Sequence, residues 1–173
     1  MNNNKIAKFK TVSYEQFEKD MIDTFDGFYS KDEIAGIYET IKLPRRATTG
    51  SAGYDFFTHI PFSLKPNQSI KIPTGIRCIM ENDWVLKLYP RSGLGFKYRL
   101  QLDNSVGVVD SDYYYSDNEG HIFIKITNDG KEGKIINLKE GDAFAQGIFL
   151  QYGITMDDDT DGVRNGGFGS TEK

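Results

Sequence analysis

Five short segments place polar side chains next to glycines, a combination that suits close contact with a ligand better than packing in a core. They read RATTGSAGYDFF (46–57), YPRSGLGFKYR (89–99), DNSVGVVDSDYYY (103–115), GDAFAQG (141–147) and RNGGFGST (164–171). After Pro90, the residues Arg91 and Ser92 and two glycine amides predict a turn that could form an anion-binding nest. The last segment carries one cation and one ring, Arg164 and Phe168, on chain too polar for a core. The pattern predicts an anion site that a mobile arm can cover.

The composition limits the classes of partner. The net charge of −4 disfavours general binding to a nucleic-acid backbone, so an anion site must create its own positive potential. The single cysteine, Cys78, excludes an intramolecular disulfide and lies in an apolar run, where we expect it to be buried. The chain start lacks an apolar signal region and no run is long enough to span a bilayer, so a cytoplasmic protein is expected.

Two amphipathic helices are predicted near the N-terminus. Residues 13–26 repeat apolar side chains every three or four positions, and Ser13 is a suitable N-cap. Residues 30–44 repeat the pattern, with Ser30 and Glu33 as a capping box and Pro44 as the stop.

The rest of the chain predicts short strands separated by turns. The segments rich in β-branched or aromatic residues are 69–73, 75–80, 84–90, 121–128, 134–138 and 143–155. Residues 128–133 (NDGKEG) predict a hairpin connection, and the acidic run 156–164 predicts a solvated hinge before the arm. Many short strands at close spacing favour an all-β barrel or sandwich.

In this order, SAGYD, PRSGLG, NSVGVVDSDY, GDAFAQ and RNGGFGST resemble the five signature motifs of the trimeric deoxyuridine triphosphatase (dUTPase) family. The resemblance spans about residues 44–171. It implies an all-β, distorted jelly-roll β-barrel in a homotrimer, with a helical insertion at about 13–42. Residues 1–155 would form the catalytic domain, and 156–173 a flexible C-terminal arm that closes over the active site.

The chain departs from the family pattern at three places. Ala143 and Phe144 stand where the family usually has arginine and a branched residue. The loop after Tyr113 is longer before its next glycine, Gly120, and one residue fewer separates Arg164 from the glycine pair.

The resemblance implies hydrolysis of dUTP to dUMP and pyrophosphate, which limits uracil in DNA and supplies dUMP. Water would attack the α-phosphorus with Asp110 as general base, while Arg91 would hold Asp110 and the phosphates. Mg²⁺ would take its direct ligands from the triphosphate and meet Asp55 through water.

The resemblance also implies the substrate contacts. Uracil would meet Asn104 and the backbone around Val106, Gly107 and Val109, and the ring of Tyr113 would pack on the deoxyribose. The expected phosphate contacts are Ser92, Gly93 and Gln146. In the arm, Arg164 would meet the γ-phosphate and Phe168 would cover the uracil, with Gly169 and Ser170 near phosphate oxygens. Each site would draw on three chains.

Two alternatives stay open at this point. A dCTP deaminase shares the fold, but that family typically has an arginine-serine-serine turn and a catalytic glutamate where this chain has PRSG and Asn128. A nucleotide-sensing regulatory protein could bind a partner through the N-terminal helices or the 114–120 loop. Neither direct nucleic-acid binding nor membrane association is expected.

Overall fold

Strands dominate the structure, a computed structural model that describes residues 5–162 and 164. The strands are β1 (Ala7–Thr11), β2 (Arg45–Arg46), β3 (Tyr54–Phe57), β4 (Phe62–Leu64), β5 (Ser69–Pro73), β6 (Ile76–Met80), β7 (Trp84–Pro90), β8 (Leu100–Leu102), β9 (Gly107–Val109), β10 (Phe123–Asn128), β11 (Ile136–Leu138) and β12 (Ala143–Gln151). The helices are α1 (Tyr14–Thr24), α2 (Lys31–Glu39), α3 (Ser92–Tyr98) and the 3-10 helix η1 (Ser111–Tyr115).

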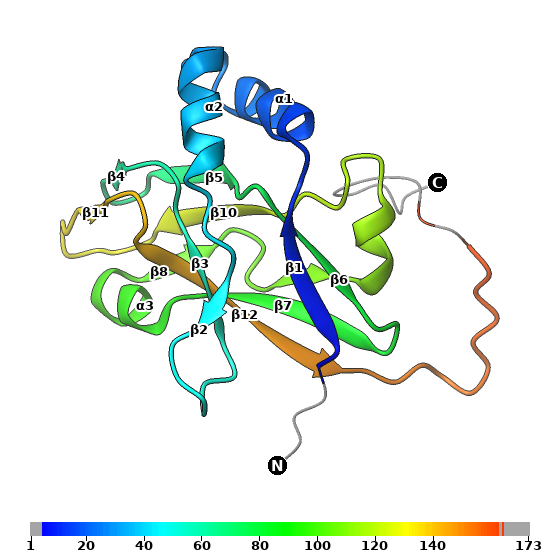
Figure 1. The fold of residues 1–173 in the computed structure, drawn as a ribbon. Helices are drawn as coiled ribbons and strands as arrows, with labels where there is room; N and C mark the ends of the chain where they lie inside the picture. The colour runs from blue at the N-terminus through cyan, green and yellow to red at the C-terminus, as the bar shows by residue number, and fades with distance from the viewer. Residues whose placement is uncertain (1–4, 163, 165–173) are drawn as a thin grey trace.

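The strands enclose one apolar core. The largest sheet has the order β2-β3-β12-β7-β9, and β5-β10-β8, β1-β6 and β11-β4 form smaller sheets around the same core (Figure 1). Its fully buried side chains include Ile72 on β5, Leu86 on β7, Ile126 on β10 and Phe144 on β12. The expected all-β barrel is therefore confirmed. No helix within 5–162 has the length and apolar character that crossing a membrane requires.

Three local expectations need correction. Residues 128–133 do not close a hairpin, because β10 pairs with β5 and β8 whereas β11 pairs with β4. The PRSGLG segment continues from its turn into the helix α3, although two of the seven helical residues are glycines that weaken helix propensity. Strands β1, β2, β4, β8 and β9 were not expected; β1 pairs with β6.

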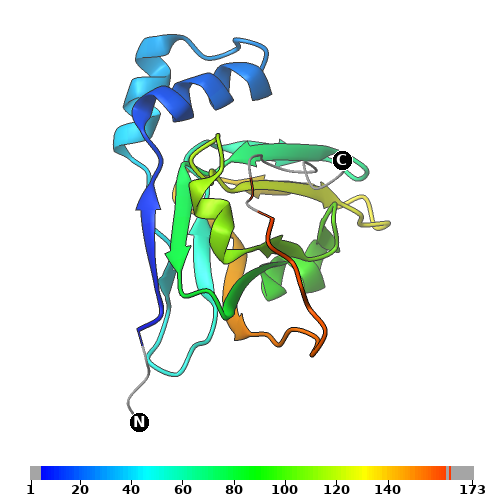
Figure 2. The same cartoon turned by 90° about the vertical axis from the view of Figure 1, so that its right-hand side faces the viewer.

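The two predicted helices are present, and they lie together at one end of the barrel (Figures 1 and 2). Helix α2 ends at Glu39, before the expected stop at Pro44, because the N–H of Thr40 already caps the last carbonyls. The Ser13 side chain caps α1 by accepting from the backbone N–H of Gln16. Ser30 and Glu33 form both bonds of a capping box at the start of α2. The helices cover a second apolar cluster of their own, made of Val12, Phe17, Met21, Ile34 and Ile60.

The titratable side chains of Cys78 and His59 are buried away from the solvent. The thiol of Cys78 is only 2% exposed, as expected, and burial raises its pKa to about 12. His59 is 4% exposed beside Phe17, with the two rings 5.3 Å apart. Neither ring nitrogen of His59 has a hydrogen-bond partner among the described residues. Burial lowers the pKa of His59 from 6.5 to about 4.

The buried His59 makes the folded chain sensitive to acid. Its folded-state pKa lies below the unfolded value, so the unfolded chain binds the proton first as the pH falls. The free energy of unfolding should therefore fall between about pH 6.5 and pH 4, by up to about 3 kcal/mol from this group. Urea unfolding near neutral pH and at about pH 4 measures the loss. The variant His59→Leu should show a smaller loss, and an unchanged pH slope in that variant would contradict the assignment.

Candidate active site

Side chains from three of the five segments meet at one end of β7. Register places Gln146 on β12 opposite Asp55 on β3 and Tyr89 on β7. The Arg91 guanidinium, which follows β7, pairs with the carboxylate of Asp55 (Nε to Oδ1, 3.2 Å). The side-chain amide of Gln146 donates to the carbonyl of Pro90 at 3.2 Å. A carboxylate, a guanidinium and an amide thus converge, although these segments lie far apart in the sequence.

Helix α3 adds backbone donors to the same end. The carbonyl of Arg91 accepts from the N–H groups of Leu94 and Gly95 (3.0 and 2.9 Å). The N–H groups of the first helical residues, Ser92 and Gly93, have no i−4 carbonyl partner in such a helix. A Cβ on Gly93 would meet no atom within 4 Å, so the space before it is open.

A pocket of about 470 Å³ opens at this point, lined by Arg91, Ser92, Gly93, Leu94, Leu138, Asp142 and Ala143. We call Asp55, Arg91, Ser92, Gly93 and Gln146 the phosphate half-site, because their donors and charge suit an anion.

A second group of predicted residues follows β8. The turn into β9 holds Ser105 in a left-handed conformation (φ 64°), and the backbone N–H of Val106 donates to the carbonyl of Asn104 at 2.7 Å. Because β8 pairs with β10 and β9 pairs with β7, this connection joins two sheets and is not a two-stranded hairpin. At Gly107 a Cβ would lie 2.9 Å from the Cβ of Leu88, so only glycine allows this close approach. Val109 is buried and anchors the end of the segment.

An ion pair secures this turn. The carboxylate of Asp103 lies 2.8 Å from the ammonium of Lys125, and it also accepts from the hydroxyl of Thr127. Partial burial would raise the pKa of the Asp103 carboxyl, but the bonds from Lys125 and Thr127 lower it overall. The Asp103–Lys125 ion pair therefore stabilises the turn beside Asn104.

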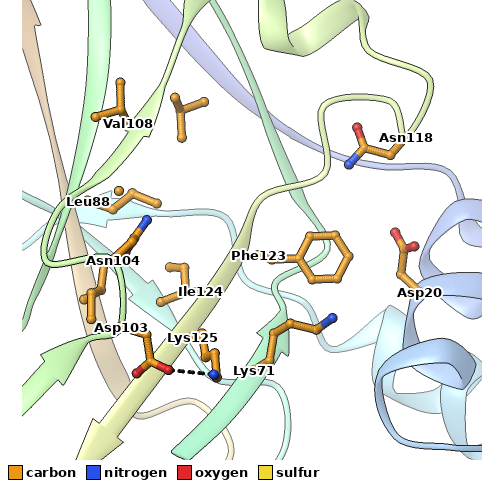
Figure 3. Close-up of a pocket in the computed structure, with 13 residues that line it drawn as sticks. Asp20, Lys71, Leu88, Asp103, Asn104, Val108, Asn118, Phe123, Ile124 and Lys125 are labelled. Atoms are coloured by element: carbon orange, nitrogen blue, oxygen red, sulfur yellow. Dashed lines mark ion pairs between the residues drawn. The ribbon is translucent and has the colours of Figure 1, made fainter. Parts of the chain in front are cut away.

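The turn borders a pocket of about 570 Å³ (Figure 3). Asp103 and Asn104 lie at one end of it, and Asp20 and Asn118 at the other, with Phe123 between them. Gly107, Val108 and Val109 also line it. We call Asn104, Val106, Gly107, Val109, Asp110 and Tyr113 the base half-site.

The predicted general base and the arm arginine are in contact. The carboxylate of Asp110, 47% exposed, lies 2.5 Å from Nη2 of Arg164, and Asp112 lies 3.0 Å from Nε of the same guanidinium. The guanidinium is also 5.6 Å from the ring centroid of Tyr113. Tyr113 is buried, its hydroxyl donates to the carbonyl of His121 at 2.7 Å, and burial raises its pKa.

The structure does not bring Arg91 and Asp110 together within one chain. Val109, the neighbour of Asp110, pairs with Leu86 on β7. Arg91 follows Leu86 by five residues, so it lies roughly 17 Å further along the strand direction at about 3.3 Å per residue. The expectation that Arg91 holds Asp110 is therefore not met by a single chain, in which Arg91 pairs with Asp55 instead.

Three predicted arm residues, Phe168, Gly169 and Ser170, lie outside the described residues. Of the arm, 156–162 and Arg164 are described: 156–162 are exposed, Arg164 is partly buried, and the segment runs back along the barrel (Figure 2).

Comparison with known proteins decides the family. The dUTPase family model matches residues 39–172. The chain belongs to the dUTPase family. A deoxyuridine 5'-triphosphate nucleotidohydrolase of Lactococcus lactis is 40% identical over 134 residues, which cover 76% of this chain and 88% of that protein. One of Desulfitobacterium hafniense is 38% identical over 138 residues, which cover 75% and 87%.

Solved dUTPases share the fold. The crystal structure of dUTPase from Streptococcus mutans superposes with a TM-score of 0.61 and 29% identity, over 85% of this chain and 97% of that chain. A dUTPase from phage phi11 of Staphylococcus aureus superposes with a TM-score of 0.61 over 92% and 97%; at 20% identity it supports the fold alone.

The structure also explains Asn128, the residue at the position where a dCTP deaminase would need a glutamate. Asn128 is fully buried, and its amide nitrogen donates to the carbonyls of Leu64 and Lys134 at 2.9 Å each. Its amide oxygen accepts from the N–H of Gly130 at 3.1 Å. These bonds to the backbone make Asn128 a structural residue, so nothing here favours the deaminase alternative.

Several residues around the dUTPase motifs were missed by sequence reasoning. A Cβ on Gly53 would lie 2.6 Å from Oε1 of Gln146, so this glycine allows the amide to reach the phosphate half-site. Lys125, Asp20 and Asn118 come from segments without a motif and reach the pocket only through the fold. Only Gly53 could have been found from the sequence, because it lies within the motif segment 46–57.

Proposed function

We propose that this chain hydrolyses dUTP to dUMP and pyrophosphate, with Asp110 as the base that activates water for attack on the α-phosphorus. Membership of the dUTPase family supports the reaction class. Asp110 directly follows β9, which lines the pocket of about 570 Å³, and its carboxylate is half exposed. Both features support its role as the base. A general base of this kind contributes about 10²–10⁴ in rate.

The separation of the two half-sites is the observation that supports an oligomeric assembly. Arg91 and Asp110 lie at opposite ends of the β7–β9 pairing, and the two pockets share no lining residue. A nucleotide that contacts both must therefore lie between the phosphate half-site of one copy and the base half-site of another. We propose a homotrimer with three such sites, in which Arg164 and Phe168 of the arm complete the charge and cover the uracil.

Base selection would come from a rigid turn. The Asp103–Lys125 ion pair would hold Asn104 and the backbone of Val106 in place for hydrogen bonds to uracil. Gly107 lies tightly against Leu88. A rigid backbone wall can exclude the methyl group of thymine better than an apolar pocket, which discriminates one methyl by only about 10–200-fold. The ring of Tyr113 would pack against the deoxyribose.

The donor chemistry fits Mg²⁺ held mainly by the substrate. Within the described residues, no cluster of three or more His, Cys, Asp or Glu side chains could chelate a metal. Asp55 supplies a single carboxylate next to Arg91, which suits an ion that keeps several waters and takes oxygens from phosphates. Bound there, Mg²⁺ would neutralise phosphate charge, and Asp55 would hold it through water.

Substrate choice tests the proposed function. With magnesium present, pyrophosphate release should be fast with dUTP and slower by several orders of magnitude with dTTP, UTP and dCTP, because each differs from dUTP at the methyl, sugar or base edge that the site contacts. Measurement of kcat/KM for the four nucleotides, with ammonia release from dCTP followed in parallel, gives the ranking. Equal turnover of dTTP or UTP, or ammonia from dCTP, would contradict the proposal.

A further inference from the structure

Helix α1 contributes to the pocket of about 570 Å³ although it precedes the family match, which begins at residue 39. Asp20 on α1 and Asn118 on the loop after η1 line the same end of it (Figure 3). These are the two regions for which the family motifs supply no role. Their contacts lead to one residue of the base half-site, Tyr113.

The first connection runs through His121, which is fully buried. The carboxylate of Asp20 lies 2.5 Å from Nδ1 of His121, and Nε2 accepts from the backbone N–H of Gly75 at 2.7 Å. These partners assign the proton to Nδ1, so the ring donates to Asp20. The carbonyl of the same His121 accepts from the Tyr113 hydroxyl at 2.7 Å. Helix α1, His121 and Tyr113 are therefore joined in series.

The second connection runs through the loop. Ser13, the N-cap of α1, donates from its backbone N–H and its hydroxyl to the carboxylate of Glu119 (2.8 and 2.6 Å), which also pairs with Arg77 at 3.4 Å. Partial burial would raise the pKa of Glu119, but the bonds from Ser13 and the charge of Arg77 lower it overall. One residue earlier, the amide of Asn118 donates to the Tyr113 hydroxyl at 2.9 Å.

We propose that α1 and the 114–120 loop act together as a brace that fixes Tyr113 and so sets the discrimination between deoxyribose and ribose. Asp20 and Glu119 are its positioning residues. The hydroxyl of Tyr113 has a fixed place because it donates to the carbonyl of His121 and accepts from the amide of Asn118. The His121 ring is bonded to Asp20 on α1, and Glu119, the neighbour of Asn118, is bonded to the α1 N-cap Ser13. A small tilt of the ring would open room for a 2′-hydroxyl. The inference rests on the proposed function, in which Tyr113 packs on the sugar.

The test compares Asp20→Ala and Glu119→Ala with the native chain and with Glu18→Ala. Glu18 is a matched control, because it is on the same helix but its carboxylate pairs with Lys31 of α2 (3.3 Å).

The readouts are KM and kcat for dUTP and UTP, and the dissociation constants of their non-hydrolysable α,β-imido analogues. The brace variants should lose about 10-fold of the preference for dUTP, mainly through KM and binding, which is the usual effect of one lost hydrogen bond. Glu18→Ala should keep the native preference, and Asp20→Asn, which retains an acceptor for His121, should restore most of it.

Each outcome decides the question. An unchanged preference in folded Asp20→Ala and Glu119→Ala, checked by circular dichroism and gel filtration, would overturn the brace and leave the helices a stabilising role only. Should Asp20→Ala fail to fold, the partly exposed Glu119→Ala carries the test, with Glu18→Ala as its control. A native chain that does not prefer dUTP over UTP would instead contradict the proposed function, which is a separate result.

Discussion

The variant Asp110→Asn should lose about 10²–10⁴ of the turnover of dUTP while it still binds nucleotide. Asparagine keeps the size of the side chain and can accept a hydrogen bond, but it cannot take a proton from water at neutral pH. Pyrophosphate release measures kcat, and calorimetry with α,β-imido dUTP measures binding.

Asp112→Asn is the matched control for Asp110. Its carboxylate pairs with the same guanidinium, Nε of Arg164 at 3.0 Å, and it is similarly exposed. We expect its kcat to stay within a few-fold of the native value. If Asp110→Asn turns over dUTP at a native rate, or if both variants lose activity equally, Asp110 is not the base.

Two inactive variants should restore each other's activity when mixed. Arg91→Ala lacks a phosphate contact and Asp110→Asn lacks the base, so each alone should be nearly inactive. Because Arg91 and Asp110 lie far apart along β7, a site would take Arg91 from one copy and Asp110 from another. Random reassembly of equal amounts should then give intact pairs at about a quarter of the sites, and about a quarter of native activity.

The control for the mixing experiment is a chain with both substitutions. Mixed with the native chain, the double variant tests exchange of subunits, and mixed with either single variant it should restore nothing. Activity is measured after dilution from denaturant or after prolonged incubation of the two variants together. No recovery in a mixture that has demonstrably exchanged would show that each site lies within a single chain.

The local elements were well predicted where a side chain bonds to its own neighbourhood. Ser13, and Ser30 with Glu33, mark the helix starts because their capping bonds are formed within three residues. Strand β7 was predicted at its observed bounds, and the burial of Val85, Leu86 and Leu88 fits a barrel wall. The motifs identified the family and the candidate residues for the same reason, since each is a short contiguous segment.

The partners of those residues could not be predicted, because they depend on register between distant strands. Only the pairing of β7 with β9 shows that Arg91 is out of reach of Asp110. Helix α3 was taken for a turn because two glycines lower helix propensity, whereas bonds to the Arg91 carbonyl favour the helix here. The contact of Asp20 with His121 joins residues 101 positions apart, and neither belongs to a motif.

The division of the site between the two ends of β7 has a consequence for mixed populations of chains. A copy with a damaged Arg91 spoils the site to which it lends that arginine, even if every other copy is intact. A copy with a damaged Asp110 spoils a different one. A copy with only one of these lesions spoils one site, so activity would fall no faster than the share of intact chains. A copy that lacks both residues spoils two sites, and only such copies would act as dominant inhibitors of intact ones.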